Sequence, residues 1–333
     1  MKAVFLSENN DQIKRVYTKS QILKLEEEFN EKLLMLTRGD LEEKKEETKD
    51  VEYIFSTWGM EMLNEEEITE FFPNLKCVFY GAGSVQHFAR PFINKGIKVF
   101  SSWCANGIPV AEYTVAQIIL ANKGFFQLQR LAKQGKRDEA REVNKNYNGN
   151  YGEKIGIIGA GVIGKEVINL LKAYKLEVLV FDPFLSDENA EKLGVKKCGL
   201  EEIFETCSVV SNHLANNEHT VNMLNFNLFS KMRKYSTFIN TGRGAQVVEN
   251  DLVKVLEERK DIVALLDVTY PEPPVEGHKF YELENVILTP HIAGSSGDEV
   301  HRMAEYMIDE YLRYKNNEET KYEVTLKMLE TMA

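Results

Sequence analysis

Short apolar runs recur along the chain and are separated by stretches in which apolar residues return at helical spacing. Short runs rich in β-branched and aromatic residues are typical of buried parallel strands, and their alternation with helical patterns predicts an α/β fold. A charged stretch of mixed sign at residues 40–50 predicts a solvated helix or loop. In the N-terminal part the pattern predicts strands at residues 3–6, 33–36, 53–56, 77–80 and 97–100, and helices at 19–30 and 62–72.

The middle of the chain has a different pattern. Residues 106–107 and Pro109 interrupt the alternation, and a long, largely apolar helical pattern covers residues 110–131. Because proline suits the first turn of a helix, we expect an interdomain helix there, with residues 106–107 acting as a hinge. Polar residues 135–150 predict a surface segment that leads into the second half of the chain.

The alternation of strands and helices resumes in the second half and predicts a doubly wound parallel sheet. A capping-box pattern, Ser296 followed by Glu299, precedes an amphipathic helix at residues 297–314. This helix lies beyond the last predicted strand, and we expect it to return to the N-terminal domain. The predicted strands of this half are 155–158, 178–181, 208–211, 237–240, 262–266 and 286–288, and the helices lie near 162–174, 200–206, 225–231 and 250–258.

The most informative stretch is a glycine-rich turn between a predicted strand and a predicted helix. Gly159, Gly161 and Gly164 have the spacing G-x-G-x-x-G. In such a turn the first glycine allows the tight bend, the second lets the backbone approach a pyrophosphate, and the third lets the helix pack on the strand. The helix start offers free N–H groups and a positive dipole end to phosphates. A glycine-rich turn without a ligand is the alternative, because such loops also occur by chance.

Asp182 ends the predicted strand that follows this helix. Its carboxylate can accept hydrogen bonds from both hydroxyls of the adenosine ribose, and it would repel a 2′-phosphate. The nearest basic residues, Lys192 and Lys196, lie further along the chain. We therefore expect NAD rather than NADP as the cofactor.

The composition limits the class of protein. The 333 residues suffice for two domains, and 43% hydrophobic with 28% charged residues is ordinary for a soluble protein. A net charge of −11 disfavours nucleic acid or an acidic membrane surface as a partner. No apolar run reaches the ~20 residues of a membrane helix, and the N-terminus does not resemble a signal peptide. The four cysteines have no C-x-x-C spacing, which favours a cytoplasmic protein with reduced thiols.

Polar clusters follow three of the later predicted strands. Arg243 lies between glycines in N-T-G-R-G. Asp267 and Glu272 lie in D-V-T-Y-P-E-P, and His291 lies in T-P-H-I-A-G. Ligands of open parallel sheets collect at the carboxyl ends of strands, so we expect these side chains at the same edge as the glycine turn. Taken singly, each also has a structural interpretation: an ion pair for the arginine, turn caps for the carboxylates and a hydrogen-bonded core site for the histidine. The histidines lack metal-binding spacing, so no metal site is predicted.

Two loops of the N-terminal part also follow predicted strands. One contains Trp58. The other contains Gly81, Ala82 and Gly83, in the sequence G-A-G-S. The second loop lacks the third glycine of a dinucleotide turn, but its backbone N–H groups can hold a small carboxylate. A tight strand–helix turn without a ligand is the alternative interpretation.

These motifs, taken in order, resemble those of the D-isomer-specific 2-hydroxyacid dehydrogenase family, and the resemblance covers nearly the whole chain. They are G-A-G-V-I-G with the downstream Asp182, F-I-N-T-G-R-G, L-L-D-V-T-Y-P-E-P and L-T-P-H-I-A-G, with N-G-I-P-V-A-E-Y-T at the interdomain helix. The resemblance implies two Rossmann-like doubly wound parallel-sheet domains, the second a NAD-binding domain inserted into the first. The implied substrate-binding domain is discontinuous, residues 1–104 plus 298–333, and the implied NAD-binding domain covers residues 105–297.

The resemblance also implies roles for single residues. Arg243 would bind the substrate's carboxylate and reacting oxygen, His291 would be the general acid/base, and Glu272 would be its partner. A hydrogen bond from His291 to Glu272 would fix the imidazole tautomer and stabilise the imidazolium. The implied substrate-binding residues are Trp58, Gly81, Ala82, Gly83 and Arg243. The implied cofactor-binding residues are Gly159, Gly161, Val162, Ile163, Gly164, Asp182, Leu214, Ala215, Thr220, Thr241, Gly242, Asp267 and Gly294.

The function implied by the resemblance is NAD-dependent hydride transfer between a small anionic D-2-hydroxyacid and its 2-oxoacid. Formate is disfavoured, because the family's formate dehydrogenases use a glutamine where this chain has Glu272. A homodimer through the long helix is also implied. The alternative is a non-enzymatic NAD(H)-sensing regulatory protein of the same fold, which would bind NADH without reducing any 2-oxoacid.

Overall fold

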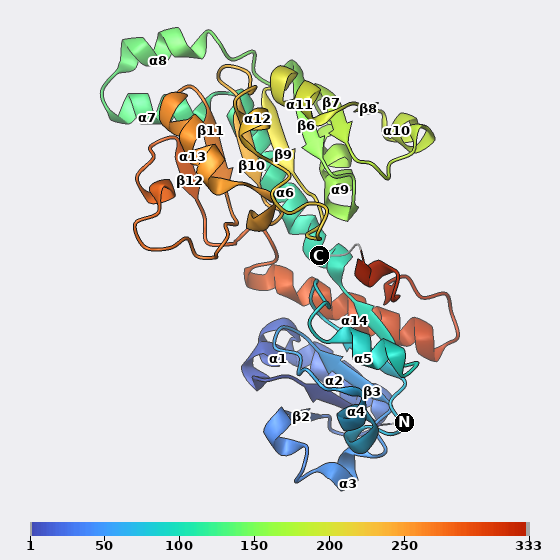
Figure 1. The fold of residues 1–333 in the computed structure, drawn as a ribbon. Helices are drawn as coiled ribbons and strands as arrows, with labels where there is room; N and C mark the ends of the chain where they lie inside the picture. Colours follow the sequence, from blue (N-terminus) through green and yellow to red (C-terminus); the bar gives the residue numbers. More distant parts are fainter. Residues whose placement is uncertain (1, 331–333) are drawn as a thin grey trace. The chain divides into compact units, whose positions relative to one another are not determined.

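Each half of the chain is built on its own sheet. The computed structural model describes residues 2–330, and the chain divides into unit 1, Met1–Asn106 with Ser295–Ala333, and unit 2, Gly107–Gly294 (Figure 1). Unit 2 is therefore inserted into unit 1, and both units have the α/β architecture that the sequence predicted. The assignment of substrate binding to unit 1 stays a prediction.

Six strands form the sheet of unit 1, in the order β13-β5-β4-β3-β1-β2. All neighbours are parallel except β13, which pairs antiparallel with β5. The strands are β1 (Ala3–Leu6), β2 (Leu34–Leu36), β3 (Tyr53–Ser56), β4 (Cys77–Tyr80), β5 (Lys98–Ser101) and β13 (Glu323–Val324). The helices are α1 (Asn10–Val16), α2 (Lys19–Phe29), α3 (Lys45–Thr48), α4 (Glu65–Phe71), α5 (Ala89–Asn94) and α14 (Val300–Lys315), with short 3₁₀ turns at Arg38–Asp40, Gly297–Glu299 and Met328–Glu330.

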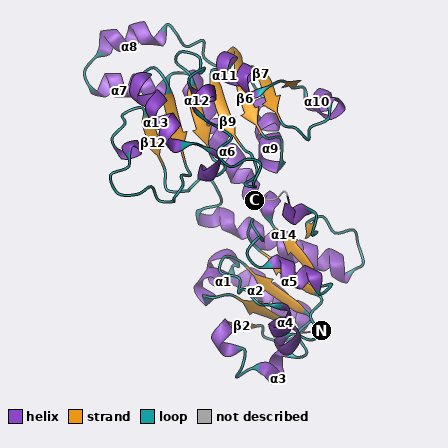
Figure 2. Cartoon of the chain, viewed as in Figure 1, coloured by secondary structure: helices purple, strands orange, loops and turns teal. Residues whose placement is uncertain are grey.

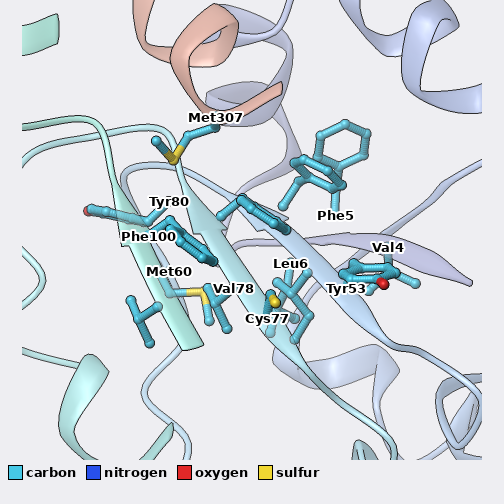
Figure 3. Packing of buried hydrophobic residues seen from close by; sticks show 14 of the residues in the cluster. Val4, Phe5, Leu6, Tyr53, Met60, Cys77, Val78, Tyr80, Phe100 and Met307 are labelled. Carbon is cyan, nitrogen blue, oxygen red and sulfur yellow. The ribbon is translucent and has the colours of Figure 1, made fainter. Parts of the chain in front are cut away.

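Aromatic side chains fill the core of unit 1. The ring of Phe79 stacks on Phe100 with centroids 5.0 Å apart, and it stacks on Phe55 at 5.2 Å. Phe100 of β5 and Met307 of α14 both belong to this buried cluster (Figure 3). Every residue of β1, β3 and β4 is buried, which explains why these strands are continuous apolar runs in the sequence.

Seven parallel strands form the sheet of unit 2, in the order β12-β11-β10-β9-β6-β7-β8. Phe238 of β10 packs in one hydrophobic cluster and its neighbour Ile239 in another, so helices cover both faces of the sheet (Figure 2). The strands are β6 (Tyr151–Ile158), β7 (Lys175–Phe181), β8 (Lys196–Lys197), β9 (Val209–Asn212), β10 (Thr237–Asn240), β11 (Val263–Leu266) and β12 (Val286–Leu288). The helices are α7 (Phe125–Lys133), α8 (Arg137–Asn144), α9 (Val162–Leu171), α10 (Asp187–Leu193), α11 (Leu200–Thr206), α12 (Phe226–Phe229) and α13 (Glu249–Glu258), with 3₁₀ turns at Gly244–Gln246 and Lys279–Tyr281.

The prediction of one long helix at residues 110–131 is wrong at both ends. Helix α6 spans Trp103–Asn122, so residues 106–107 lie inside it, and it accommodates Pro109 in its second turn. The helix stops early because Gly124 has a left-handed φ of +67°, and the ring of Tyr147 occupies the place of a Cβ on that residue. A separate helix, α7, begins at Phe125.

The last helix, α14, belongs to unit 1, as the sequence predicted. The carboxylate of Glu299 accepts the N–H of Ser296 at 3.0 Å, which is the predicted capping contact. Glu310, fully buried on α14, accepts the N–H groups of Lys321 and Tyr322. These bonds hold the segment that leads into β13, which pairs with β5.

Candidate active site

The turn that follows β6 has a different steric requirement at each of its three glycines. Gly159 has a φ of +92°, and a Cβ there would lie 2.7 Å from the carbonyl oxygen of His213. A Cβ on Gly164 would lie 2.0 Å from the carbonyl oxygen of Gly159, so α9 packs on the loop only if this residue is glycine. A Cβ on Gly161 would meet no atom within 4 Å. Because packing does not require glycine at position 161, the close approach of a ligand's phosphates to bare backbone is the role left for it.

Asp182, which directly follows β7, is bonded to the glycine turn. Its Oδ2 accepts the N–H of Ala160 at 2.6 Å, and its Oδ1 accepts the N–H of Phe184 at 2.7 Å. A carboxylate oxygen has two lone pairs, so both oxygens can still accept from ribose hydroxyls. The turn and Asp182 therefore fit the pyrophosphate and ribose of a dinucleotide.

His291 and Glu272 form a hydrogen-bonded pair, with 2.6 Å between Nδ1 and Oε1. An ionised carboxylate only accepts hydrogen bonds, so Nδ1 is the donor in this pair. The two side chains are 49% and 41% exposed, so the imidazole remains accessible from outside. Nε2 is then the nitrogen that can exchange a proton with a substrate.

A buried carboxylate holds the loop that carries His291. Asp267 is 3% exposed, and it accepts the N–H groups of Ile292 and Ala293 at 2.9 Å and the hydroxyl of Thr289 at 2.6 Å. Its carbonyl oxygen accepts the N–H of His291 at 3.0 Å. These bonds support a φ of +53° at His291, which is uncommon for a residue with a side chain. In this structure Asp267, predicted to contact the cofactor, positions the histidine.

Arg243 follows β10 and is partly buried, and its Nη1 donates to the carbonyl oxygen of Gly242 at 2.8 Å. Burial lowers the pKa of Arg243, and the negative charge of Glu272 opposes that shift. The guanidinium is thus within electrostatic range of Glu272, which itself binds His291. The three side chains come from the ends of three neighbouring strands, β10, β11 and β12.

The loops that carry Arg243 and Glu272 touch through a glycine. A Cβ on Gly244 would lie 2.0 Å from the carbonyl carbon of Thr269. No side chain fits at position 244 unless the two loops separate. The glycine after Arg243 therefore fixes the separation between the arginine and the segment that ends in Glu272.

Three buried amide side chains, which the sequence analysis missed, hold the Arg243 loop. Asn212 donates to Asn240 at 3.0 Å and to Gln246 at 2.6 Å. Gln246 accepts the N–H of Arg243 at 3.2 Å and donates to the carbonyl oxygen of Leu214 at 2.8 Å. A signal was present in the sequence, because β9 and β10 both end in asparagine and a buried amide needs partners.

Other predicted cofactor residues lie near the same edge and have structural partners. The hydroxyl of Thr220 donates to the carbonyl oxygen of Ala215 at 2.7 Å, and that of Thr241 lies 3.3 Å from the hydroxyl of Thr114. Val162 is 46% exposed at the start of α9. Their contact with a cofactor stays a prediction, as does that of Ile163 on α9, Gly242 after β10 and Gly294 after β12.

In unit 1, hydroxyl groups hold the loop after β4. The N–H of Gly81 donates to the carbonyl oxygen of Ser56 at 2.8 Å and is therefore occupied. Ser101 donates to the carbonyl oxygens of Ala82 at 2.8 Å and Gly83 at 2.6 Å. Within residues 2–330 the N–H groups of Ala82 and Gly83 reach no acceptor, which leaves these two for the predicted carboxylate contact.

Other kinds of site have little support in the part of the chain that the structure describes. Residues 2–330 hold no cluster of three His, Cys, Asp or Glu side chains able to bind a metal ion. The four cysteines are free thiols, and burial raises the pKa of Cys77 and of Cys207 to about 12, so neither forms a reactive thiolate near neutral pH. Over the same residues, every helix is too short or too polar to span a bilayer.

Comparison with protein families supports the interpretation of unit 2 as a dinucleotide-binding domain. Residues 115–293 match the family described as D-isomer specific 2-hydroxyacid dehydrogenase, NAD binding domain. The matched segment contains the glycine turn, Asp182, Arg243, Glu272 and His291. The nicotinamide dinucleotide predicted from the glycine turn is therefore supported by the family of this segment.

Curated relatives cover a larger part of the chain. The D-3-phosphoglycerate dehydrogenase of Archaeoglobus fulgidus is 30% identical over 233 residues, which are 70% of this chain and 44% of that protein. The putative 2-hydroxyacid dehydrogenase YoaD of Bacillus subtilis is 32% identical over 206 residues, which are 61% of this chain and 59% of that protein. The matches thus span less than two thirds of either relative's length.

Solved structures extend the similarity to the whole fold. The D-mandelate dehydrogenase of Rhodotorula graminis superposes with a TM-score of 0.77 at 20% identity, covering 97% of this chain and 98% of that one. A D-2-hydroxyisocaproate dehydrogenase superposes with a TM-score of 0.73 at 18% identity, covering 98% of this chain and 100% of that one. At these identities the similarity shows the fold, two Rossmann-like domains with one inserted into the other.

Proposed function

Because the chain belongs to the D-isomer-specific 2-hydroxyacid dehydrogenase family, we propose that it interconverts a small D-2-hydroxyacid and its 2-oxoacid with NAD as redox partner. The observation that carries the proposal is the 2.6 Å hydrogen bond between His291 and Glu272, with Arg243 within electrostatic range of Glu272. Together these side chains supply a general acid, the group that orients it and a cation for an anionic substrate.

The cofactor would be held by the glycine turn and Asp182, and when bound it supplies the hydride. The N–H groups at the start of α9 would face its phosphates, and Gly161 would let the backbone approach them. The carboxylate of Asp182 favours NAD over NADP, because it accepts from ribose hydroxyls and repels a 2′-phosphate.

The proton and the charge of the substrate are handled by the chain's own residues. In the reductive direction the imidazolium of His291 donates from Nε2 to the substrate's carbonyl oxygen, while Glu272 accepts from Nδ1. The guanidinium of Arg243 stabilises the negative charge that develops on that oxygen, and its planar fork also fits the substrate's carboxylate. In the oxidative direction neutral His291 accepts the hydroxyl proton at Nε2.

The test is a screen for NADH oxidation with glyoxylate, pyruvate, hydroxypyruvate, 3-phosphohydroxypyruvate and bulkier 2-oxoacids. We expect saturable oxidation with at least one of them and a product of D configuration. A protein that binds NADH but oxidises it with none of these acids would contradict the proposal and would favour an NAD(H)-sensing role.

A further inference from the structure

A cation without an ion-pair partner lies at the carboxyl edge of the unit 1 sheet. Arg15 is exposed in the last turn of α1, and its guanidinium carbon lies 5.4 Å from the centre of the Trp58 ring. Within residues 2–330 it forms no ion pair, whereas the ammonium of its neighbour Lys14 lies 3.6 Å from the carboxylate of Asp11. In a chain with a net charge of −11, such a cation is suited to an anion from outside the protein.

The indole ring under Arg15 belongs to a loop that is held in place. The hydroxyl of Ser7 donates to the carbonyl oxygen of Trp58 at 3.2 Å, and the N–H of Glu8 donates to that of Gly59 at 2.7 Å. These bonds join the loops after β1 and β3, which are neighbouring parallel strands. The acids of these two loops are Glu8 and Glu61, and within residues 2–330 neither forms an ion pair with Arg15. Glu61 is buried and accepts the N–H of Arg38 at 2.9 Å. The guanidinium therefore lies over a ring whose loop is fixed, and no ion pair within residues 2–330 neutralises it.

The glycine loop at residues 81–83, which the sequence predicted to contact the substrate's carboxylate, is next to this pair. Strand β4 neighbours β3, and the hydroxyl of Thr57 donates to the carbonyl oxygen of Gly81 at 2.8 Å. Tyr17, two residues after Arg15, also reaches this loop, because a Cβ on Gly81 would lie 3.3 Å from its hydroxyl. The cation, the indole and the glycine loop thus follow one another along the same edge of the sheet.

A cation–π contact does not use up the hydrogen-bond donors of arginine. The ring attracts the positive charge electrostatically, and the five N–H groups of the guanidinium stay available for other acceptors. The planar fork of these groups matches a carboxylate or a phosphate through two parallel hydrogen bonds. The contact with the ring also limits the side chain's rotamers before a ligand binds, which reduces the entropy lost on binding.

We propose that Arg15, held on Trp58, binds a second anionic group of the substrate. The preferred 2-oxoacid is then dianionic, with a carboxylate or a phosphate at the end of its side chain. This inference rests on the proposed function, because it presumes a 2-oxoacid whose first carboxylate is bound elsewhere in the site. In this proposal Arg15 selects among such acids by charge and takes no part in proton or hydride transfer.

The experiment compares matched pairs of substrates that differ in the second charge. Steady-state NADH oxidation is measured for 2-oxoglutarate against 2-oxopentanoate, and for 3-phosphohydroxypyruvate against hydroxypyruvate, with the full-length wild type and with Arg15→Gln. We expect the wild type to prefer the dianionic member of at least one pair, and the two pairs separate a carboxylate from a phosphate. In Arg15→Gln this preference should fall about tenfold, mainly through KM, because the lost contact is charge-assisted and partly exposed.

Two further variants separate the specific contact from a change in overall charge. Lys14→Gln removes the same charge from the same helix and should leave the preference unchanged, and Arg15→Lys should restore part of it. An equal loss with both members of a pair, or an unchanged preference in Arg15→Gln, would overturn the inference while the proposed function stands. If the wild type oxidises NADH with no 2-oxoacid, the proposed function fails and this inference fails with it.

Discussion

At the scale of single residues, the proposed function gives the two nitrogens of His291 different tasks. Nδ1 is bonded to Glu272 at 2.6 Å, and Nε2 is proposed to exchange a proton with the substrate. Removing the imidazole should therefore stop proton transfer without disturbing the glycine turn that would bind the dinucleotide. We expect His291→Asn to lower kcat by roughly 10²- to 10⁴-fold and to keep the Kd for NADH, measured by fluorescence, near the wild-type value.

A second histidine of unit 2 provides the control for that variant. His278 also faces a carboxylate, with Nε2 3.6 Å from Glu249, but it lies outside the proposed site. His278→Asn should keep the wild-type kcat. Normal turnover by His291→Asn would remove this histidine from the mechanism.

Arg243 is expected to act through its shape as well as its charge. A lysine keeps the positive charge but replaces the planar fork with a point charge. Arg243→Lys should therefore raise KM and lower kcat, reducing kcat/KM by about 100-fold, which corresponds to about 3 kcal/mol of transition-state stabilisation. Steady-state kinetics with the best 2-oxoacid measures this, and an unchanged kcat/KM would place Arg243 outside the site.

The buried His213 makes the stability of unit 2 depend on pH. Burial lowers its pKa from 6.5 to about 4, and within residues 2–330 its Nδ1 has no hydrogen-bond partner, while Nε2 lies 2.9 Å from the hydroxyl of Ser211. Between these two pKa values the unfolded chain binds the proton and the folded chain does not. The free energy of unfolding therefore falls as the pH drops through this window.

We expect this residue to account for roughly 2 kcal/mol of lost stability between about pH 7 and about pH 5. His213→Gln, which does not titrate, should show a correspondingly smaller loss. Urea unfolding of both proteins at the two pH values measures the difference. Parallel pH dependences would show that His213 does not hold its neutral form in the folded state.

At this scale the sequence indicated the candidate site residues better than the hydrogen bonds that hold their loops in place. Arg243, Glu272 and His291 each follow an apolar run, and their motifs resemble those of a known family, although each residue taken singly also has a structural interpretation. The positioning role of Asp267 could not be predicted, because its partners are backbone N–H groups 25 and 26 residues away, which no residue type reveals. The same holds for Gln246, whose partners lie on another loop.

At the scale of elements, the glycine turn allows its steric and ligand-binding roles to be tested separately. Gly164→Ala would place a Cβ 2.0 Å from a carbonyl oxygen, whereas Gly161→Ala would place one in open space. We expect Gly164→Ala to lower the free energy of unfolding by about 2 kcal/mol or more. Gly161→Ala should keep the wild-type stability but raise the Kd for NADH by about tenfold, because its methyl group faces the phosphates.

Chemical denaturation and NADH titration of the two variants check this contrast. Equal stability of both variants would contradict the packing role of Gly164. An unchanged Kd in Gly161→Ala would contradict the proposed place of the pyrophosphate.

The bounds of several elements followed from burial alone. Residues 53–56, 77–80 and 237–240 are predicted and observed strands, because every residue in them is buried and their central residues are apolar. The seven-residue helices α1 and α10 and the six-residue helix α5 were missed because they are short. Helix α8, within the predicted surface segment, was missed because none of its residues is buried. The end of α6 could not be predicted, because it depends on the contact between Gly124 and Tyr147.

At the scale of the whole molecule, the sequence predicted the fold class and the insertion of one domain into another. It did not predict which strands are neighbours: β9 lies beside β6 although β7 and β8 come between them in the chain. That order brings the loop after β9 to the glycine turn, where a Cβ on Gly159 would meet His213. The homodimer implied by the family stays a prediction, which light scattering of the purified chain would check.

The most direct test of the central claim follows the hydride itself. NADH deuterated at C4, in each of its two configurations, is incubated with the protein and its best 2-oxoacid. The product enantiomers are separated on a chiral column, and their deuterium content is measured by mass spectrometry. We predict a D-2-hydroxyacid with one deuterium at C2 from only one of the two cofactors, and product from His291→Asn at a rate lower by roughly 10²- to 10⁴-fold. A product of L configuration, or one without deuterium from either cofactor, would contradict the account.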